Sequence, residues 1–387
     1  MPLSNGKIEI IFMTIEKAEF YSGPLIPEEF IERIRNEEEI SIDLEADGLH
    51  HYNARLCLIQ INAADRISIV DPLANKNASE LFEAMKGKLI ILHSGAYDLK
   101  LMHDDFGFVP DRVFDTMLAI QLLGYEKLGL ADLVLKHFGV ELAKGPQKMD
   151  WSIRPLPENM MEYAANDVKY LPELRKRLAE ELDSKGRLGW LYESCEHMIY
   201  TFLHPADTVH EERWRVKGAS GLDRKALAYL REFWAWRERE AQESDVPVFK
   251  ILQNEKLIEL SVWCSEELKS VYEWPLFDKQ IKRRQRGERL EKARNAAKRL
   301  SQDKWPLRKI RQPQTQMDVN PEVFERIKSA RDVAAEALGI DPPLIANHKT
   351  LSKIAALTID DPEILVTRLG LMNWQKDILS NAVCRRS

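Results

Sequence analysis

A pair of carboxylates stands at the end of an apolar run, in the segment Ser41-Ile42-Asp43-Leu44-Glu45. Side chains two apart on a strand point to the same face, so Asp43 and Glu45 are expected to lie side by side. Neighbouring carboxylates repel each other unless a cation lies between them, and hard divalent ions prefer oxygen ligands. The pair is therefore a candidate metal site, with a solvated strand end as the plain alternative.

Two further acidic residues occur where helices are expected. Asp98 follows the apolar strand pattern Lys88–His93 and opens an apparent helix, so a helix N-cap is its plain alternative. Tyr163 and Asp167 are four residues apart in a helical pattern and therefore lie on one helix face. Taken alone, that pair also fits a partly exposed tyrosine above a solvated aspartate.

Residues 1–180, which must position these side chains, alternate between strand and helix patterns. Short apolar or alternating runs predict strands at Glu39–Leu44, Leu56–Asn62, Ile67–Val70 and Leu89–His93. Helical spacing predicts helices at Glu28–Asn36, Asn77–Lys86, Asp98–Asp105, Asp115–Leu123, Leu130–Phe138 and Pro157–Tyr163, continuing to Ser184. Strands first and helices later are typical of an α/β domain with one mixed sheet.

Beyond about Gly186 the strand patterns end, and the rest of the chain is predicted to be all-α. A long amphipathic helix is expected at Leu222–Gln242, with Trp234 and Trp236 among its apolar positions and more consistent with a core role than with base stacking. Later helices are interrupted at Asp245–Pro247, Trp274–Pro275, Trp305–Pro306 and Asp341–Pro343.

Composition bounds the class of protein. The 387 residues are 44% hydrophobic and 30% charged, which fits two or three globular domains. Neither a secretory signal nor a membrane-spanning run is visible, so a cytoplasmic protein is expected. The four cysteines are too scattered for a zinc site or a disulfide framework.

Charge is unevenly distributed along the chain. Between Pro275 and Pro313 there are 14 Lys/Arg residues against 4 Asp/Glu, a local balance of +10 within a net charge of −6. The remainder of the chain therefore carries −16. The part of this stretch at Lys279–Arg311 is predicted to form a helix whose positive face guides phosphate, with an ordinary solvated helix as the alternative.

The order of the acidic motifs resembles the three-part pattern of the DEDDy exonucleases. More specifically, Asp43–Leu49 followed by Arg55–Ile61 is similar to the first motif of the ribonuclease D family. Gly129–Leu133 through Asp150–Leu156, and then Tyr163–Val168, also resemble that family. The resemblance covers about residues 20–182.

The second half carries its own resemblance. Leu227–Glu238, followed by Asp245–Pro247, is similar to the helicase-and-RNase-D C-terminal (HRDC) domain, and the last segment looks like a divergent second copy. The implied fold class is α/β: a ribonuclease H-like mixed-sheet exonuclease domain followed by all-α HRDC-type helical domains. The expected boundaries are 1–200 for the exonuclease, 207–295 for the HRDC domain and 296–387 for the second HRDC-like domain.

The family resemblance implies roles for the acidic residues. Asp43, Glu45, Asp98 and Asp167 would hold two divalent metal ions, Mg²⁺ or Mn²⁺, and Tyr163 would hold the attacking water. An unperturbed tyrosine has a pKa of about 10, so orienting water is the safer role for it than acting as a bulk base. The implied activity is 3′→5′ hydrolysis of RNA from its 3′ end, releasing nucleoside 5′-monophosphates, in 3′ maturation of tRNA precursors and other small stable RNAs.

Residues around the motifs are candidates for contacting the RNA strand. The expected nucleic-acid-binding residues are Gln60, His93, Lys144, Lys148, Trp151 and Arg154. For those between the second and third motifs, the competing interpretation is surface charge with Trp151 in the core. The expected partner is RNA with a single-stranded 3′ end, such as a tRNA precursor, bound by a monomer that needs no membrane.

Two other functions remain open at this point. One is a DNA-directed 3′→5′ exonuclease of the same superfamily, although the chain has no P-loop and no room for a polymerase. The other is a non-catalytic RNA-binding scaffold on a nuclease fold. The presence of all five matching polar groups argues against the scaffold.

Overall fold

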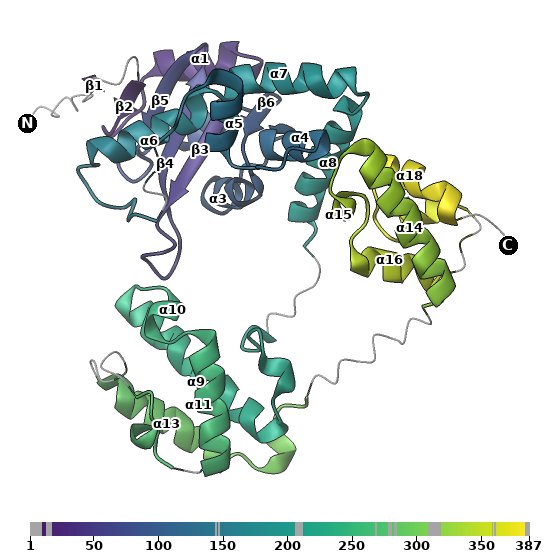
Figure 1. The fold of residues 1–387 in the computed structure, drawn as a ribbon. Helices are drawn as coiled ribbons and strands as arrows, with labels where there is room; N and C mark the ends of the chain where they lie inside the picture. The colour runs from purple at the N-terminus through teal and green to yellow at the C-terminus, as the bar shows by residue number, and fades with distance from the viewer. Residues whose placement is uncertain are drawn as a thin grey trace, which may run out of the picture. The chain divides into compact units, whose positions relative to one another are not determined.

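A computed structural model of the chain describes residues 10–12, 18–143, 145, 148–205, 212–267, 269–277, 281, 285–308, 319–357, 359 and 361–383. The chain divides into two compact units. Unit 1 comprises Met1–Ala46, Arg55–His204 and Met317–Ser387, and unit 2 comprises Asp47–Ala54 and Pro205–Gln316. Figure 1 shows the ribbon of both units, with labels on many of their helices and strands.

Unit 1 is built on a mixed sheet. Among the described residues its strands are β1 (Ile10–Phe12), β2 (Ala18–Tyr21), β3 (Glu39–Ala46), β4 (Leu56–Ala63), β5 (Arg66–Val70), β6 (Leu89–Leu92) and β7 (Arg112–Asp115), in the order β1-β2-β5-β4-β3-β6-β7. β4 pairs antiparallel with β3 and β5, whereas β6 runs parallel to β3 and β7. The mixed sheet expected from the sequence is confirmed. The short strands β1, β2 and β7 were not predicted. β6 is no longer than β2 or β7, but its residues Leu89–Leu92 form an uninterrupted apolar run that the sequence analysis recognised.

The nuclease part of unit 1 contains eight helices in the described residues. They are α1 (Glu28–Asn36), α2 (Ser79–Ala84), α3 (Ala96–Phe106), α4 (Thr116–Leu123), α5 (Leu130–Phe138), α6 (Glu158–Lys169), α7 (Leu171–Ser184) and α8 (Leu188–Leu203). α6 packs over β3, β4 and β5. Its buried residues Met161, Ala164, Ala165 and Val168 recur at helical spacing, so one face of α6 is fixed against the sheet.

The C-terminal helices share the core of unit 1. They are α14 (Pro321–Leu338), α15 (Pro342–Ile345), α16 (His348–Ala355), α17 (Glu363–Thr367) and α18 (Asn373–Val383). Trp190 of α8 stacks on Trp374 with ring centroids 5.0 Å apart, and Glu193 accepts a hydrogen bond from the backbone N–H of Asn373 at 2.6 Å. The compact units therefore do not follow the three expected domains in chain order, and the exact domain boundaries stay a prediction.

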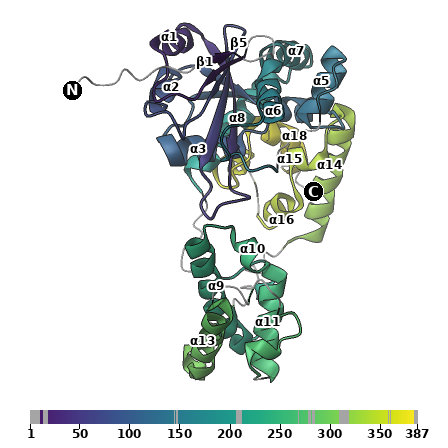
Figure 2. The same cartoon turned by 90° about the vertical axis from the view of Figure 1, so that its left-hand side faces the viewer.

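Unit 2 is helical, as Figure 2 shows. Its described elements are the short η2 (Ala219–Gly221), η3 (Val271–Glu273) and η5 (Gln302–Lys304) and the helices α9 (Arg224–Ser244), α10 (Val248–Ile251), α11 (Asn254–Glu267) and α13 (Arg286–Arg299). α9 begins after Asp223, whose side chain accepts a hydrogen bond from the N–H of Ala226. Trp236 is buried in this core, as the sequence predicted, and Trp234 is half-buried against it.

The all-α second half is thus confirmed within the described residues. In those same parts of the chain, no helix is long and apolar enough to cross a membrane.

Candidate active site

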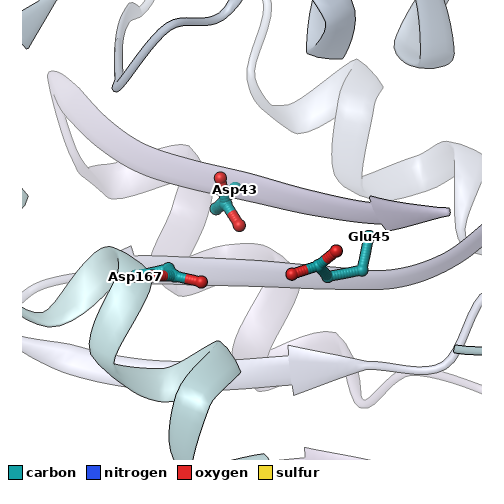
Figure 3. A group of neighbouring side chains, drawn as sticks. All are labelled: Asp43, Glu45 and Asp167. Carbon is teal, nitrogen blue, oxygen red and sulfur yellow. The ribbon is translucent and has the colours of Figure 1, made fainter. Parts of the chain in front are cut away.

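Three carboxylates from two elements converge at one place on the sheet. Asp43 and Glu45 project from β3, and Asp167 projects from α6 above it. One carboxylate oxygen of each lies within 4.8 Å of the others. Figure 3 shows the three side chains on their elements. The same-face placement of Asp43 and Glu45 follows from strand alternation, and the packing of α6 over β3 adds Asp167.

Asp98 lies close to this cluster. It occupies the first turn of α3, which begins at Ala96, and its side chain is buried. Burial, and then repulsion by Asp43, raise the pKa of Asp98. Asp98 is also the smallest of the contributions, after burial, Asp43 and Asp167, that raise the pKa of Glu45. The four predicted ligands therefore share one electrostatic environment, although Asp98 is not part of the tight group of three.

The loop before Asp98 is held by a residue that the sequence analysis did not single out. Asp115 accepts hydrogen bonds from the backbone N–H groups of Ser94 at 3.0 Å and Gly95 at 2.9 Å, and it also caps the start of α4. Ser94 has a left-handed backbone, with φ of 66°. Asp115 thereby fixes the approach to α3. An aspartate before a helix was the available signal, but it indicated only a cap.

Burial and mutual repulsion dominate the electrostatics of the cluster. Burial, and then the charge of Asp167, hold the pKa of Asp43 well above its usual range. Burial, followed by its acidic neighbours, raises the pKa of Glu45 to about 10. Burial raises the pKa of Asp167 to about 7, opposed by a hydrogen bond from Tyr163. Within the described residues none of the four acids forms an ion pair, so the site lacks positive charge and its donors suit a hard divalent ion.

Tyr163 lies next to Asp167 on the same face of α6, and its hydroxyl donates a hydrogen bond to that carboxylate. Its ring centroid is 6.1 Å from that of Trp151. A Cβ atom at position 145 would overlap the ring, so only glycine lets the chain at Gly145 approach Tyr163 so closely. The tyrosine ring is therefore held between the chain at Gly145 and the nuclease core.

The residues expected to contact RNA fall into different environments. Trp151 is completely buried, which favours its core alternative. Arg154 forms a two-point ion pair with Asp71, at 2.5 and 2.8 Å, and donates to three backbone carbonyls, so its guanidinium is bound within unit 1. Lys148 is exposed, as its predicted role requires.

The other three residues expected to contact RNA are either buried, partly buried or outside the described residues. Gln60 is completely buried in β4, and His93 is partly buried with its Nδ1 2.9 Å from Thr116 Oγ1. Lys144 lies outside the described residues.

Several cations of the basic stretch Lys279–Arg311 pair with acids in unit 2 instead of facing solvent. Arg286 and Arg289 pair with the buried Glu240, and Arg294 pairs with Glu291 at 3.0 Å. The described cations exposed in this stretch are Lys292, Lys298, Arg299, Lys304 and Arg308. The helix predicted over the whole stretch is seen from Arg286 to Arg299, and the prediction is wrong beyond it, because residues 300–308 contain only the short η5. Residues 279–280, 282–284 and 309–311 lie outside the described part.

Comparison with known families matches both halves of the chain. Residues 22–183 match the family described as 3′-5′ exonuclease, and residues 226–292 match the HRDC domain. The fold and the acidic site thus define an exonuclease that carries an HRDC domain.

Individual relatives indicate which kind of exonuclease the chain resembles. The chain is 34% identical to ribonuclease D of Gluconacetobacter diazotrophicus, over 60% of this chain and 59% of that relative. It is 29% identical to ribonuclease D of Sphingobium indicum, over 87% of each. Both relatives are named ribonuclease D, so the chain is similar to ribonuclease D, a 3′→5′ exoribonuclease.

Solved structures support the same fold. A protein from Bifidobacterium adolescentis superposes with a TM-score of 0.75 at 24% identity, covering 94% of this chain and 97% of that one. Escherichia coli RNase D superposes with a TM-score of 0.69, also at 24% identity, covering 92% and 94%. The expected ribonuclease H-like exonuclease domain followed by helical domains is therefore confirmed as a fold.

Proposed function

We propose that this chain removes nucleotides one at a time from the 3′ end of RNA, with Asp43, Glu45, Asp98 and Asp167 as ligands of two divalent metal ions, Mg²⁺ or Mn²⁺. The observation that carries the proposal is the convergence of Asp43, Glu45 and Asp167 within 4.8 Å of one another. Half-buried carboxylates that crowd together without a cationic partner are costly to keep ionised. Their retention at one point is explained if a cation joins them.

The donor set fits hard ions. All four proposed ligands are carboxylates, and neither histidine nor cysteine joins the group found in the described residues, which disfavours zinc. When bound, divalent ions supply Lewis-acid chemistry by making water more acidic and by neutralising charge on the leaving 3′ oxygen. The four carboxylates in turn offset the charge of two dications, leaving room for a phosphate.

The chain's own residues position the reactants. Tyr163 donates a hydrogen bond to Asp167, so the lone pairs of its hydroxyl oxygen are left to accept a hydrogen bond from water. In this role Tyr163 orients the attacking water toward the terminal phosphodiester. Hydrolysis then releases a nucleoside 5′-monophosphate and leaves a new 3′ hydroxyl on the shortened strand.

The substrate proposal rests on the relatives. The curated relatives are named ribonuclease D, and the Escherichia coli enzyme is described as an exoribonuclease involved in structured RNA processing. We assign to this chain the 3′ maturation of tRNA precursors and other small stable RNAs, in the cytoplasm, where such RNAs are processed. The HRDC domain would hold the RNA, Lys148 would contact the strand, and a monomer would suffice.

A labelled-substrate assay tests this proposal. Purified protein is incubated with 5′-labelled RNA bearing a single-stranded 3′ end and with its DNA counterpart, each with Mg²⁺, Mn²⁺ or EDTA. Asp43→Asn is compared with Asp65→Asn, the same change at an exposed residue. A tRNA precursor with a 3′ trailer is compared with the mature tRNA.

The expected result is a metal-dependent ladder on RNA that Asp43→Asn loses and Asp65→Asn keeps, with the trailer removed and the mature tRNA spared. Equal degradation of DNA would overturn the substrate preference but keep the site. Activity in EDTA, or full activity of Asp43→Asn, would overturn the proposed metal ligands.

A further inference from the structure

A strip of polar side chains runs under α6 beside the acidic cluster. The register of β3 and β4 pairs Ser41 with Asn62, Asp43 with Gln60 and Glu45 with Leu58. Residues directly opposite each other in an antiparallel pair share a face, as do residues two apart on one strand. Of these six same-face positions only Leu58 is apolar, which is unusual for the interior face of a central strand.

The strip contains several buried polar atoms without a hydrogen-bond partner among the described residues, namely Ser41 Oγ, Asn62 Oδ1 and both polar atoms of Gln60, and Gln60 is the one amide with neither atom bonded. Its side chain is completely buried, and neither its Oε1 nor its Nε2 has a hydrogen-bond partner among the described residues. An unpaired buried amide disfavours folding, whereas an apolar residue of the same shape avoids that cost. An orphaned group of this kind requires a water, an ion or a functional partner to account for it.

Asn62, two residues along β4, shows what one part of the strip does. Its Nδ2 donates to the backbone carbonyls of Val168 at 3.3 Å and Lys169 at 3.5 Å. These carbonyls are in the last turn of α6, where Val168 also accepts a hydrogen bond from the backbone N–H of Tyr170. Asn62 thus ties β4 to the end of α6 directly after Asp167, so the strip already fixes one side of the acidic cluster.

We propose that Gln60 is a positioning residue for Asp43, whose buried amide hydrogen-bonds the Asp43 carboxylate, directly or through one water, when a divalent cation occupies the acidic cluster. Directly opposed residues have Cβ atoms about 4.5–5.5 Å apart, within reach of such a bond. Ligating carboxylates are commonly oriented by an outer layer of hydrogen bonds. The inference rests on the proposed role of Asp43 as a ligand. This positioning role takes the place of the RNA contact expected for Gln60, because a completely buried side chain cannot contact RNA.

The test compares Gln60→Met with Tyr229→Phe in the full chain. Methionine keeps the length and removes the amide, and Tyr229→Phe deletes another buried hydroxyl that has no partner among the described residues, in unit 2. Mn²⁺ binding is measured by electron paramagnetic resonance without RNA. Thermal unfolding of the metal-free protein and single-turnover cleavage at saturating RNA are measured alongside.

Gln60→Met is expected to weaken Mn²⁺ binding and slow cleavage by about 10–100-fold, the usual effect of losing an outer-layer partner. Its metal-free Tm should stay level or rise, and Tyr229→Phe should bind Mn²⁺ and cleave like the wild type. Wild-type binding and cleavage by Gln60→Met would overturn the inference. A lowered metal-free Tm would do so too, since the amide would then have a structural partner. Failure of the wild type to bind Mn²⁺ would instead overturn the proposed metal site.

Discussion

The two units cluster charged side chains in opposite ways. In unit 2, Glu240 is buried on α9 and is met by Arg286 at 3.3 Å and by both donors of Arg289. In unit 1, Asp43, Glu45 and Asp167 lie together without an ion pair among the described residues. One cluster pairs an acid with cations, whereas the other holds only acids.

This difference separates a structural cluster from a reactive one. Removing a partner from a buried ion pair leaves an uncompensated charge, so the pair must stay whole for the unit to fold well. A group of like charges does not stabilise the folded chain by itself. We therefore expect a cation from outside the chain to balance it. The same acid-to-amide change should therefore have opposite consequences in the two clusters.

The largest effect is expected from Asp43→Asn. Divalent ions stabilise transition-state charge by several kcal/mol, so losing a ligand should slow cleavage by about 10³-fold or more. The metal-free Tm should rise, because one buried like charge is gone. Single-turnover cleavage and thermal unfolding measure both effects. A destabilised but active variant would reverse the comparison.

Glu240→Gln should behave in the opposite manner. It leaves the guanidinium of Arg286 buried without its carboxylate, which is expected to destabilise unit 2 by about 3 kcal/mol. Urea unfolding, monitored by tryptophan fluorescence, measures this loss in the free energy of unfolding. Cleavage of a short single-stranded RNA should continue at the wild-type rate. Unchanged stability would mean that the ion pair contributes nothing.

Tyr163→Phe sharpens the comparison within the acidic cluster. It removes a hydroxyl but no carboxylate, so Mn²⁺ binding should persist while cleavage slows by about 10²-fold. The hydrogen bond that lowers the pKa of Asp167 is also lost. Parallel binding and single-turnover measurements separate the two roles. Equal losses of binding and rate would make Tyr163 part of the ligand framework instead.

The acidic cluster should also give stability a distinctive pH dependence. The folded pKa of Asp167 is raised from 3.8 to about 7 and that of Glu45 from 4.5 to about 10. Their contribution to metal-free stability is therefore complete below about pH 4 and is lost as pH rises through those folded values. Mg²⁺ should consequently raise the Tm more at pH 8 than at pH 5.5, with no such difference in Asp43→Asn. An equal rise at both pH values would contradict the shifts.

The smallest effect concerns the outward cations of unit 2. Lys298 is exposed on α13, unlike the inward Arg286 and Arg294. Lys298→Glu should therefore reduce the slope of the logarithm of the RNA-binding constant against the logarithm of the salt concentration by about 1. Lys349→Glu, an exposed lysine on α16, makes the same change in net charge and should leave the slope unaltered. Equal slopes for both variants would assign the effect to net charge alone.

Much of the nuclease part was predictable from local patterns. Strand alternation correctly placed Asp43 and Glu45 on one face, and helical spacing correctly placed Tyr163 and Asp167 on one face of α6. Asp98 was expected to open a helix and lies in the first turn of α3. These features depend on residues within a few positions of one another, so the sequence alone contains them.

Other features escaped the sequence analysis because they depend on distant partners. Trp151 had two open interpretations until the packing showed it completely buried. A count of cations in Lys279–Arg311 did not reveal that Arg286, Arg289 and Arg294 pair inside unit 2. Nothing in the neighbouring residues shows whether a long basic side chain meets an acid or water.

The sequence by itself determined the identity and order of the acidic residues, the face that each one occupies on its strand or helix, and hence the family resemblance. Only the tertiary structure decided that α6 packs over β3, that Asp167 thereby meets Asp43, and that Gln60 is enclosed beside them. The physical reason is that backbone periodicity is a local property, whereas burial and charge neutralisation depend on which segments the fold brings together.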